Sequence, residues 1–243
     1  MAEIIQINKN TWRFEDGFVR FFLLEGEEKS VLIDSGVGSP DALKQAKSVT
    51  DKDIILLNTH GDVDHISGTA SFNVIYMHES DYNNCGIGDK FSNTSLIKVE
   101  DGDVLDLGNR PLRIVHIPGH TFGSIAILDI NERVLYSGDS VQKGHIFLFG
   151  NHRAPELYLD SLSKLVSLTS EYDYIYASHD EYKLSNEYSI KVKDAWEKVL
   201  SGHAKYEDAD LFGMQFDEQS SGTFTPKNYE VSSDELPFGG DVF

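Results

Sequence analysis

Four separate apolar segments of the sequence each lead, through a small or turn-forming residue, to a side chain that can bind a metal ion. Apolar runs of this kind, rich in β-branched residues, are typical of buried strands. Because strands hold the bases of loops rigidly, sites in layered α/β folds assemble at strand ends. The pattern therefore predicts a site where four strand ends converge. The segments and the residues that follow them are 54–57 with His60, 112–117 with His120, 134–136 with Asp139, and 174–177 with His179.

Further apolar runs predict additional strands. Turn-forming residues separate 18–24 from 31–33 and 125–128 from 134–136, so each of these two pairs is expected to form an antiparallel hairpin. The further runs lie at residues 4–7, 18–24, 31–33, 74–77 and 125–128.

Three segments have helical patterns. Ser39 and Pro40 suit an N-cap and a first helical position, which predicts a helix through about Ser48. Residues 155–170 and the segment ending at Leu200 place apolar side chains at helical spacing. Helices interleaved with strands predict a layered α/β domain.

A chain of 243 residues with 40% apolar content can bury one sizeable core, so one catalytic domain over residues 1–205 is expected. Residues 206–243 form an acidic C-terminal extension. Large apolar groups such as Phe212 and Phe238 argue against a purely disordered tail. A cover packed on the domain, a mobile segment and a homodimer contact all stay open.

The charge balance favours a small-molecule substrate. Twenty-one basic and 40 acidic side chains give a net charge of −19, which repels nucleic acid and anionic lipid. No stretch approaches the roughly 18 apolar residues of a membrane span, and the N-terminus has no secretion-signal pattern. The single cysteine, Cys85, excludes an intramolecular disulfide and fits a reducing compartment. A cytoplasmic protein is expected.

The densest group of polar residues is Thr59-His60-Gly61-Asp62-Val63-Asp64-His65. Gly61 lets the backbone turn sharply, so alternate side chains can face one point. Imidazole and carboxylate suit zinc, iron or manganese. An acidic surface turn with solvated histidines is the alternative, but His120, Asp139 and His179 follow in order and favour a metal site.

This ordered set resembles the signature of the metallo-β-lactamase superfamily, H-x-H-x-D-H followed by single His, Asp and His ligands, over roughly residues 3 to 200. The resemblance implies an α/β fold, a four-layer αββα sandwich of two mixed β-sheets with flanking helices and two divalent metal ions at one sheet edge. The ligands it implies are His60, Asp62 and His120 for the first ion, Asp64, His65 and His179 for the second, and Asp139 as the bridge.

One position departs from that signature. Asp62 stands where most members of the superfamily have the second histidine. The carboxylate makes the site harder and more anionic, so iron and manganese compete with zinc, which the family favours. The diiron oxygen reductases of the superfamily have Glu at this position. A first site that is weakly occupied or empty also stays open.

The resemblance implies a dinuclear hydrolase in which two metals share a hydroxide that attacks a small ester, thioester, lactone or phosphoester. Asp64 is the candidate catalytic residue, as a general acid or base. A glyoxalase II-like thioesterase would carry a Gly-Cys-Gly-Arg-like run that the segment after Asp139 lacks. A diiron redox protein and a metal-containing binding or regulatory protein are the alternatives.

Without metal, Asp62, Asp64 and Asp139 would repel one another, so a raised carboxylate pKa is expected in the metal-free site.

The loop between Asp139 and the helix at Pro155 is expected to border the site. It holds candidate contacts for the substrate, and its two cations can hold an anionic group. The candidates are Lys143, His145, His152 and Arg153 in the loop, and Tyr158 in the helix that follows.

Overall fold

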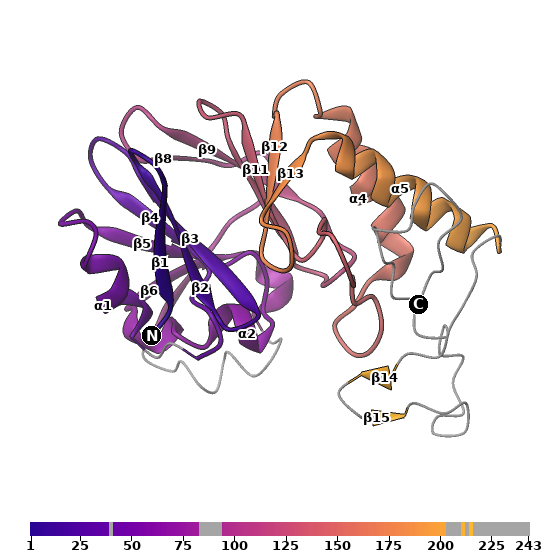
Figure 1. Ribbon diagram of the computed structural model, residues 1–243, viewed down its shortest axis with the longest axis horizontal. Coiled ribbons are helices and arrows are strands. Elements are labelled where there is room, and N and C mark those ends of the chain that lie inside the picture. Colours follow the sequence, from indigo (N-terminus) through magenta and orange to yellow (C-terminus); the bar gives the residue numbers. More distant parts are fainter. Residues whose placement is uncertain (39–40, 83–93, 203–209, 212–213, 216–243) are drawn as a thin grey trace.

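Two mixed β-sheets pack face to face, and helices cover their outer surfaces (Figure 1). The computed structural model describes residues 1–38, 41–82, 94–202, 210–211 and 214–215. In the first sheet β1 to β4 are antiparallel, whereas β4 to β7 are parallel. Its seven strands, in spatial order, are β1 (Glu3–Asn8), β2 (Thr11–Asp16), β3 (Val19–Glu25), β4 (Ser30–Ile33), β5 (Ile54–Leu57), β6 (Val74–Met77) and β7 (Ser95–Lys98).

The second sheet is antiparallel except for the parallel pair β11 and β12. Its six strands, in spatial order, are β13 (Lys183–Ser185), β12 (Tyr174–Ala177), β11 (Val134–Gly138), β10 (Ile125–Asp129), β9 (Pro111–His116) and β8 (Val104–Asp106).

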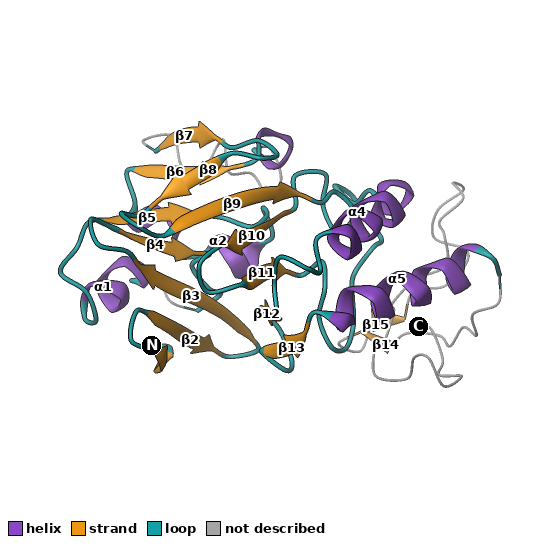
Figure 2. Ribbon diagram, turned by 90° about the horizontal axis from the view of Figure 1, so that it is seen from above, coloured by secondary structure: helices purple, strands orange, loops and turns teal. Residues whose placement is uncertain are grey.

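Helices lie outside this pair of sheets and in the loops at its edge (Figure 2). The helix α1 covers the first sheet, and α4 and α5 cover the second. The elements are α1 (Ala42–Lys47), α2 (Val63–Ile66), η1 (Thr69–Ser71), η2 (Glu79–Asp81), α4 (Pro155–Ser167) and α5 (Glu187–Leu200).

The central strands are buried on both faces, so their alternating side chains enter two different cores. In β3, Phe22 and Leu24 pack between the two sheets, while Phe21 and Leu23 pack toward α1. On the far side of the second sheet, Tyr158 of α4 and Trp196 of α5 join the third core. These three layers of packed side chains are those of an αββα sandwich, so the predicted fold class is confirmed.

The predicted hairpins are confirmed, since β3 pairs with β4 and β10 with β11 in antiparallel register. The predicted helix at residues 155–170 ends at Ser167, and the last helix begins at Glu187. The first helix starts after Asp41 as N-cap, and the predicted cap at residues 39–40 lies outside the described residues. Within the described parts of the chain, no helix is both long and apolar enough to cross a bilayer.

The predicted extension at residues 206–243 lies almost wholly outside the described residues. Its described parts are β14 (Asp210–Leu211) and β15 (Met214–Gln215), which pair with each other. The division of the chain at residue 205 therefore stays a prediction.

Candidate functional site

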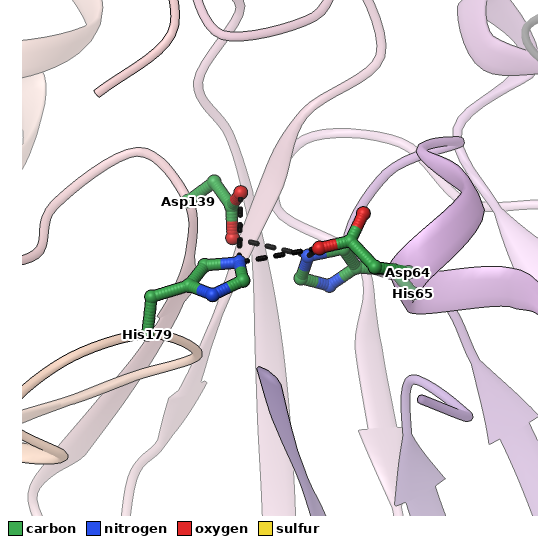
Figure 3. Close-up of side chains that lie close together, drawn as sticks. All are labelled: Asp64, His65, Asp139 and His179. Carbon is green, nitrogen blue, oxygen red and sulfur yellow. Dashed lines mark ion pairs between the residues drawn. The ribbon is translucent and has the colours of Figure 1, made fainter. Parts of the chain in front are cut away.

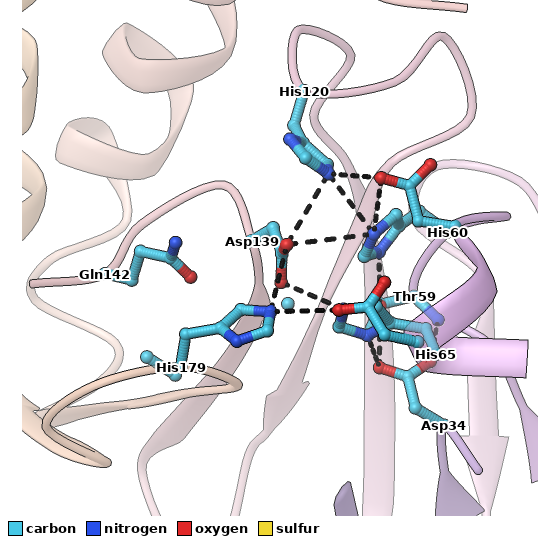
Figure 4. Close-up of polar contacts among 12 residues, drawn as sticks. Asp34, Thr59, His60, His65, His120, Asp139, Gln142 and His179 are labelled. Atoms are coloured by element: carbon cyan, nitrogen blue, oxygen red, sulfur yellow. Dashed lines mark hydrogen bonds and ion pairs between the residues drawn. The ribbon is translucent and has the colours of Figure 1, made fainter. Parts of the chain in front are cut away.

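The strand ends that the sequence singles out meet at one edge of the sandwich (Figure 4). The first sheet contributes the loop after β5 and the short helix α2. The second sheet contributes the loops after β9, β11 and β12. The structure brings all seven predicted ligands together there, in two groups. These are Asp64, His65, Asp139 and His179 in the first, and His60, Asp62 and His120 in the second.

In the group of four residues, one potential ligand atom from each side chain lies within 4.8 Å of all the others (Figure 3). The Nε2 atom of His65 is 3.2 Å from Oδ1 of Asp139 and 3.5 Å from Oδ2 of Asp64. His179 Nε2 lies 3.4 Å from the same Asp64 oxygen. The four side chains thus surround a single point.

The group of three residues is equally close. The Nε2 atoms of His60 and His120 are 3.2 Å apart. Oδ2 of Asp62 lies 3.1 Å from the His120 nitrogen and 3.6 Å from the His60 nitrogen. These three atoms all lie within 4.8 Å of one another.

Asp139 lies between the two groups. Its Oδ1 faces His65, while its Oδ2 is 3.3 Å from His179 Nε2, 3.6 Å from His120 Nε2 and 4.0 Å from His60 Nε2. Gly138 places this side chain: it has a φ of +53°, and a Cβ atom there would lie 2.9 Å from Thr59 Oγ1.

All four histidines use their Nδ1 atoms for outward contacts. A carbonyl or carboxylate oxygen can only accept, so a neutral imidazole in these contacts carries its proton on Nδ1. Thr59 Oγ1 donates its own proton to Asp34 and therefore accepts from His60. The contacts are His60 to Thr59 Oγ1 at 2.9 Å, His65 to Asp34 Oδ2 at 2.9 Å, His120 to Phe147 O at 2.8 Å and His179 to Phe18 O at 2.9 Å.

The inward Nε2 atoms of the neutral rings consequently present lone pairs to one another and to three carboxylates. Among the described residues, the buried His65 Nε2 and Asp139 Oδ1 have no hydrogen-bond partner, although they face each other. Converging lone pairs and carboxylates are unfavourable in a buried place unless a cation lies among them. Such outward contacts of ligating histidines are typical of metal sites, so this donor set fits divalent ions.

Two buried carboxylates behind the site hold these groups in place. Asp34, with a φ of +65°, accepts from the backbone and hydroxyl of Thr59 and contacts His65. Asp81 accepts from the backbone N–H groups of Gly61 and Gly123 and from Thr121 Oγ1, which joins the His60 loop to the His120 loop.

The sequence reasoning missed both carboxylates. Asp34 follows an apolar strand just as Asp139 does, so the signal for it was present. Asp81 follows no such strand end directly, and no sequence signal indicates it.

The guanidinium group of Arg153 reaches the group of three residues from the loop before α4. Its Nη2 atom is 2.7 Å from Oδ2 of Asp62, and its Nη1 atom is 3.3 Å from Nε2 of His120. The sequence reasoning considered Arg153 only as a contact for an anionic substrate, whereas the structure pairs it with Asp62.

In the metal-free site, the pKa values of two histidines are raised, so these imidazoles bind protons more tightly than usual. Burial alone would lower the pKa of His179, but Asp139 and Asp64 raise it to about 10. Burial likewise opposes the charge of His65, yet the surrounding carboxylates, Asp139 foremost, raise its pKa well above the usual value. Burial and the charge of Arg153 lower the pKa of His120.

The pKa values of the three carboxyl groups are lowered. Burial alone would raise the pKa of Asp62, but His120 and His60 hold it well below the usual range. Burial alone would also raise the pKa values of Asp64 and Asp139, but His65 and His179 outweigh it and lower both. The prediction of a raised carboxylate pKa is therefore wrong, because the interleaved imidazoles accept the protons that keep the acids charged.

The candidate substrate contacts differ in accessibility. Tyr158 is fully buried, and its hydroxyl donates to Ser140 O at 2.6 Å, so it supports the Asp139 loop from within the core and is not available to a substrate. Lys143 Nζ pairs with Glu181 at 3.3 Å. His145 and His152 are exposed in the loop.

The chain is similar to known proteins of one superfamily. Residues 15–179 match the family model described as the Metallo-beta-lactamase superfamily. The chain belongs to this superfamily. Human acyl-coenzyme A thioesterase MBLAC2 is 25% identical to it over 186 residues, which is 60% of this chain and 67% of that protein. Hydroxyacylglutathione hydrolase from Rhodopseudomonas palustris is 31% identical over 144 residues, which covers 55% of this chain and 50% of that protein.

Solved structures of the metallo-β-lactamase superfamily share the fold. A metallo-beta-lactamase from Pontibacter korlensis gives a TM-score of 0.67 at 14% identity, over 81% of this chain and 99% of that chain. The archaeal superfamily protein from Sulfolobus tokodaii gives a TM-score of 0.61 at 18% identity, over 85% and 92% of the two chains. The predictions of this superfamily and of a hydrolase of this superfamily are confirmed.

We expect Asp34→Ala to weaken metal binding by about tenfold to a hundredfold, the usual loss when the partner of a ligating histidine is removed. The substitution frees His65 Nδ1 and removes two acceptor contacts from Thr59. Competition with a chromophoric chelator would measure the affinity. Asp173→Ala, which removes an exposed carboxylate paired with Arg133, is the matched control. An unchanged affinity in Asp34→Ala would show that Asp34 does not orient a ligand.

Proposed function

We propose that this chain is a metal-dependent hydrolase that cleaves a small thioester. The observation that carries the proposal is the inward convergence of four imidazole Nε2 atoms on three carboxylates, a buried donor set that fits divalent ions. The named relatives support the choice of a thioester: one acts on acyl-coenzyme A and the other on hydroxyacylglutathione, by their names.

In this proposal the seven side chains would hold two divalent ions, zinc, iron or manganese. His60, Asp62 and His120 would hold one ion, and Asp64, His65 and His179 would hold the other. Asp139, which faces both groups, would contribute to both. When bound, such ions lower the pKa of a water toward neutrality and polarise the carbonyl group that the water attacks.

The residues of the chain supply position and proton transfer. Outward hydrogen bonds fix the four imidazole planes, so the Nε2 atoms keep their direction. Asp64 lies in the first turn of α2 with its side chain 17% exposed, which leaves it within reach of solvent. We assign it the role of orienting the attacking water and carrying its proton toward the leaving thiolate.

The substrate class is tested by a panel of S-acyl thioesters, carried by coenzyme A and by glutathione, beside an aryl ester, a lactone and a phosphodiester. We expect thioesters, followed by release of the free thiol, to have a higher kcat/KM than the other substrates, which are followed by release of their own hydrolysis products. Chelator-treated protein should lose the thioesterase activity. Turnover of the lactone or phosphodiester with none of any thioester would refute the substrate assignment. Full thioester activity in protein shown to be metal-free would refute the metal dependence.

A further inference from the structure

Arg153 contacts two of the three side chains in the His60–Asp62–His120 group. Besides the contacts with Asp62 Oδ2 and His120 Nε2, its Nη1 atom donates to His120 O at 3.1 Å. The Arg153 side chain is only 16% exposed. A guanidinium group cannot lose its proton in a protein, so this positive charge is permanent.

The atoms that Arg153 contacts are the ones that a metal ion in this group would need. A neutral imidazole has one lone pair on Nε2, and that lone pair cannot accept an N–H from Arg153 and bind an ion at about 2.0–2.1 Å at the same time. The Asp62 oxygen that lies 2.7 Å from Arg153 Nη2 also lies 3.1 Å from His120 Nε2 and 3.6 Å from His60 Nε2. Entry of an ion therefore requires Arg153 to withdraw.

The backbone on both sides of Arg153 is fastened to the His120 loop. His152 O accepts from Phe122 N at 3.1 Å, and Ala154 N donates to Gly119 O at 2.8 Å. Pro155 starts α4 immediately afterwards. The position of the guanidinium group is thus set by the fold of the loop and by a charge-assisted pair, which makes its withdrawal unfavourable.

The other group has no equivalent contact from the nearby Arg20. That guanidinium lies behind His179 and donates to backbone oxygens, those of Ala177, His179 and Asp180. Among the described residues, the Nε2 atom of His179 pairs with the carboxylates of Asp64 and Asp139. An ion can therefore enter this group without displacing the guanidinium group of Arg20.

The charge balance of the site favours one divalent ion over two while Arg153 is in place. Three carboxylates lie in the two groups, Asp62, Asp64 and Asp139. One divalent ion together with Arg153 balances them, whereas a second divalent ion beside Arg153 adds two uncompensated positive charges in a largely buried place.

We propose that Arg153 is a built-in cation of the His60–Asp62–His120 group, so that this group binds a divalent ion far more weakly than the Asp64–His65–Asp139–His179 group. The chain then holds one ion tightly, and a second enters only by displacing Arg153. This inference rests on the proposed function only in taking both groups as metal sites.

The test is calorimetric titration of chelator-treated, dialysed protein with Zn²⁺. Wild type is expected to bind one equivalent tightly and a second at least about a hundredfold more weakly. In Arg153→Gln, which removes the charge, the second affinity should rise by about tenfold or more while the first stays unchanged. Arg153→Lys, a point charge without the planar fork, should give an intermediate second affinity. Retention of the tight equivalent shows that each variant is folded.

The control is Arg133→Gln, which removes an exposed guanidinium paired with Asp173 at the starts of β11 and β12, the ends of these strands opposite to the site. It should match wild type in both affinities. Two equivalents of similar affinity in wild type would overturn the inference and leave the proposed function intact, as would an unchanged second affinity in Arg153→Gln. Absence of any Zn²⁺ binding in wild type would overturn the proposed function, and this inference with it.

Discussion

Replacing Asp139 with alanine is expected to lower kcat/KM for thioester hydrolysis by about a thousandfold or more. Metal ions contribute several kcal/mol to charge stabilisation in such reactions, and each 1.4 kcal/mol is a factor of ten in rate. Asp139 faces both ligand groups, with oxygens 3.2 Å from His65 and 3.6 Å from His120, so its loss affects both at once. The measurements are steady-state kinetics and the metal content of the purified variant.

Asp160→Ala, which removes an exposed carboxylate from α4, is the control and should keep wild-type activity and metal content. Asp139→Ala protein with near-normal turnover and full metal content would show that Asp139 does not belong to the centre. A variant that loses metal from only one group would place Asp139 in that group alone.

Removal of bound metal is expected to lower the melting temperature by about 8–16 °C at neutral pH. A ligand at a thousand times its Kd contributes about 4 kcal/mol to the stability of the native state. For a chain of this size each kcal/mol corresponds to roughly 2–4 °C. Differential scanning calorimetry of chelator-treated and metal-reconstituted protein would measure the difference.

The difference should be larger at pH 8 than at pH 6. In the metal-free protein the pKa of His179 is raised from 6.5 to about 10, so the folded state binds the proton more tightly than the unfolded chain. The stability that this contributes is complete below about pH 6.5 and is lost as the pH rises toward 10. The lowered pKa values of Asp62 and Asp64 contribute stability above about pH 4, which is present at both test values.

Bound metal has the opposite dependence, because it needs deprotonated imidazoles and so binds better at pH 8. Equal melting temperatures with and without metal at pH 8 would refute a metal site built from these residues. A metal-free protein more stable at pH 8 than at pH 6 would contradict the raised histidine pKa values.

Sequence pattern predicted the inner strands β5 and β6 with the bounds that they have in the structure, because each is a short apolar run between turn signals. The strands β7 and β8 were not predicted, because they lie at sheet edges with mostly exposed or half-exposed side chains and carry no such signal. The strand β2 was missed because polar residues interrupt its apolar positions.

The candidate site was predictable to a similar degree. His60, His120 and Asp139 follow strands, and the fold brings strand ends together, so their convergence could be read from the sequence. The pairing of Arg153 with Asp62 could not, because the two residues are 91 positions apart and only tertiary packing makes them neighbours. The pKa directions also depended on distances between side chains that the sequence does not contain.

The seven predicted ligands come in comparable numbers from the two sheets, which has a mechanical consequence. His60 to His65 follow the first sheet, whereas His120, Asp139 and His179 follow the second. An ion bound by both sets would act as a cross-link between the N-terminal and C-terminal halves of the sandwich, and a cross-link that closes a long loop restricts the unfolded chain most. A chain whose single cysteine can form no internal disulfide would gain from its metal centre the restraint that a disulfide gives other folds. Separation of the two halves and opening of the centre would then be one event.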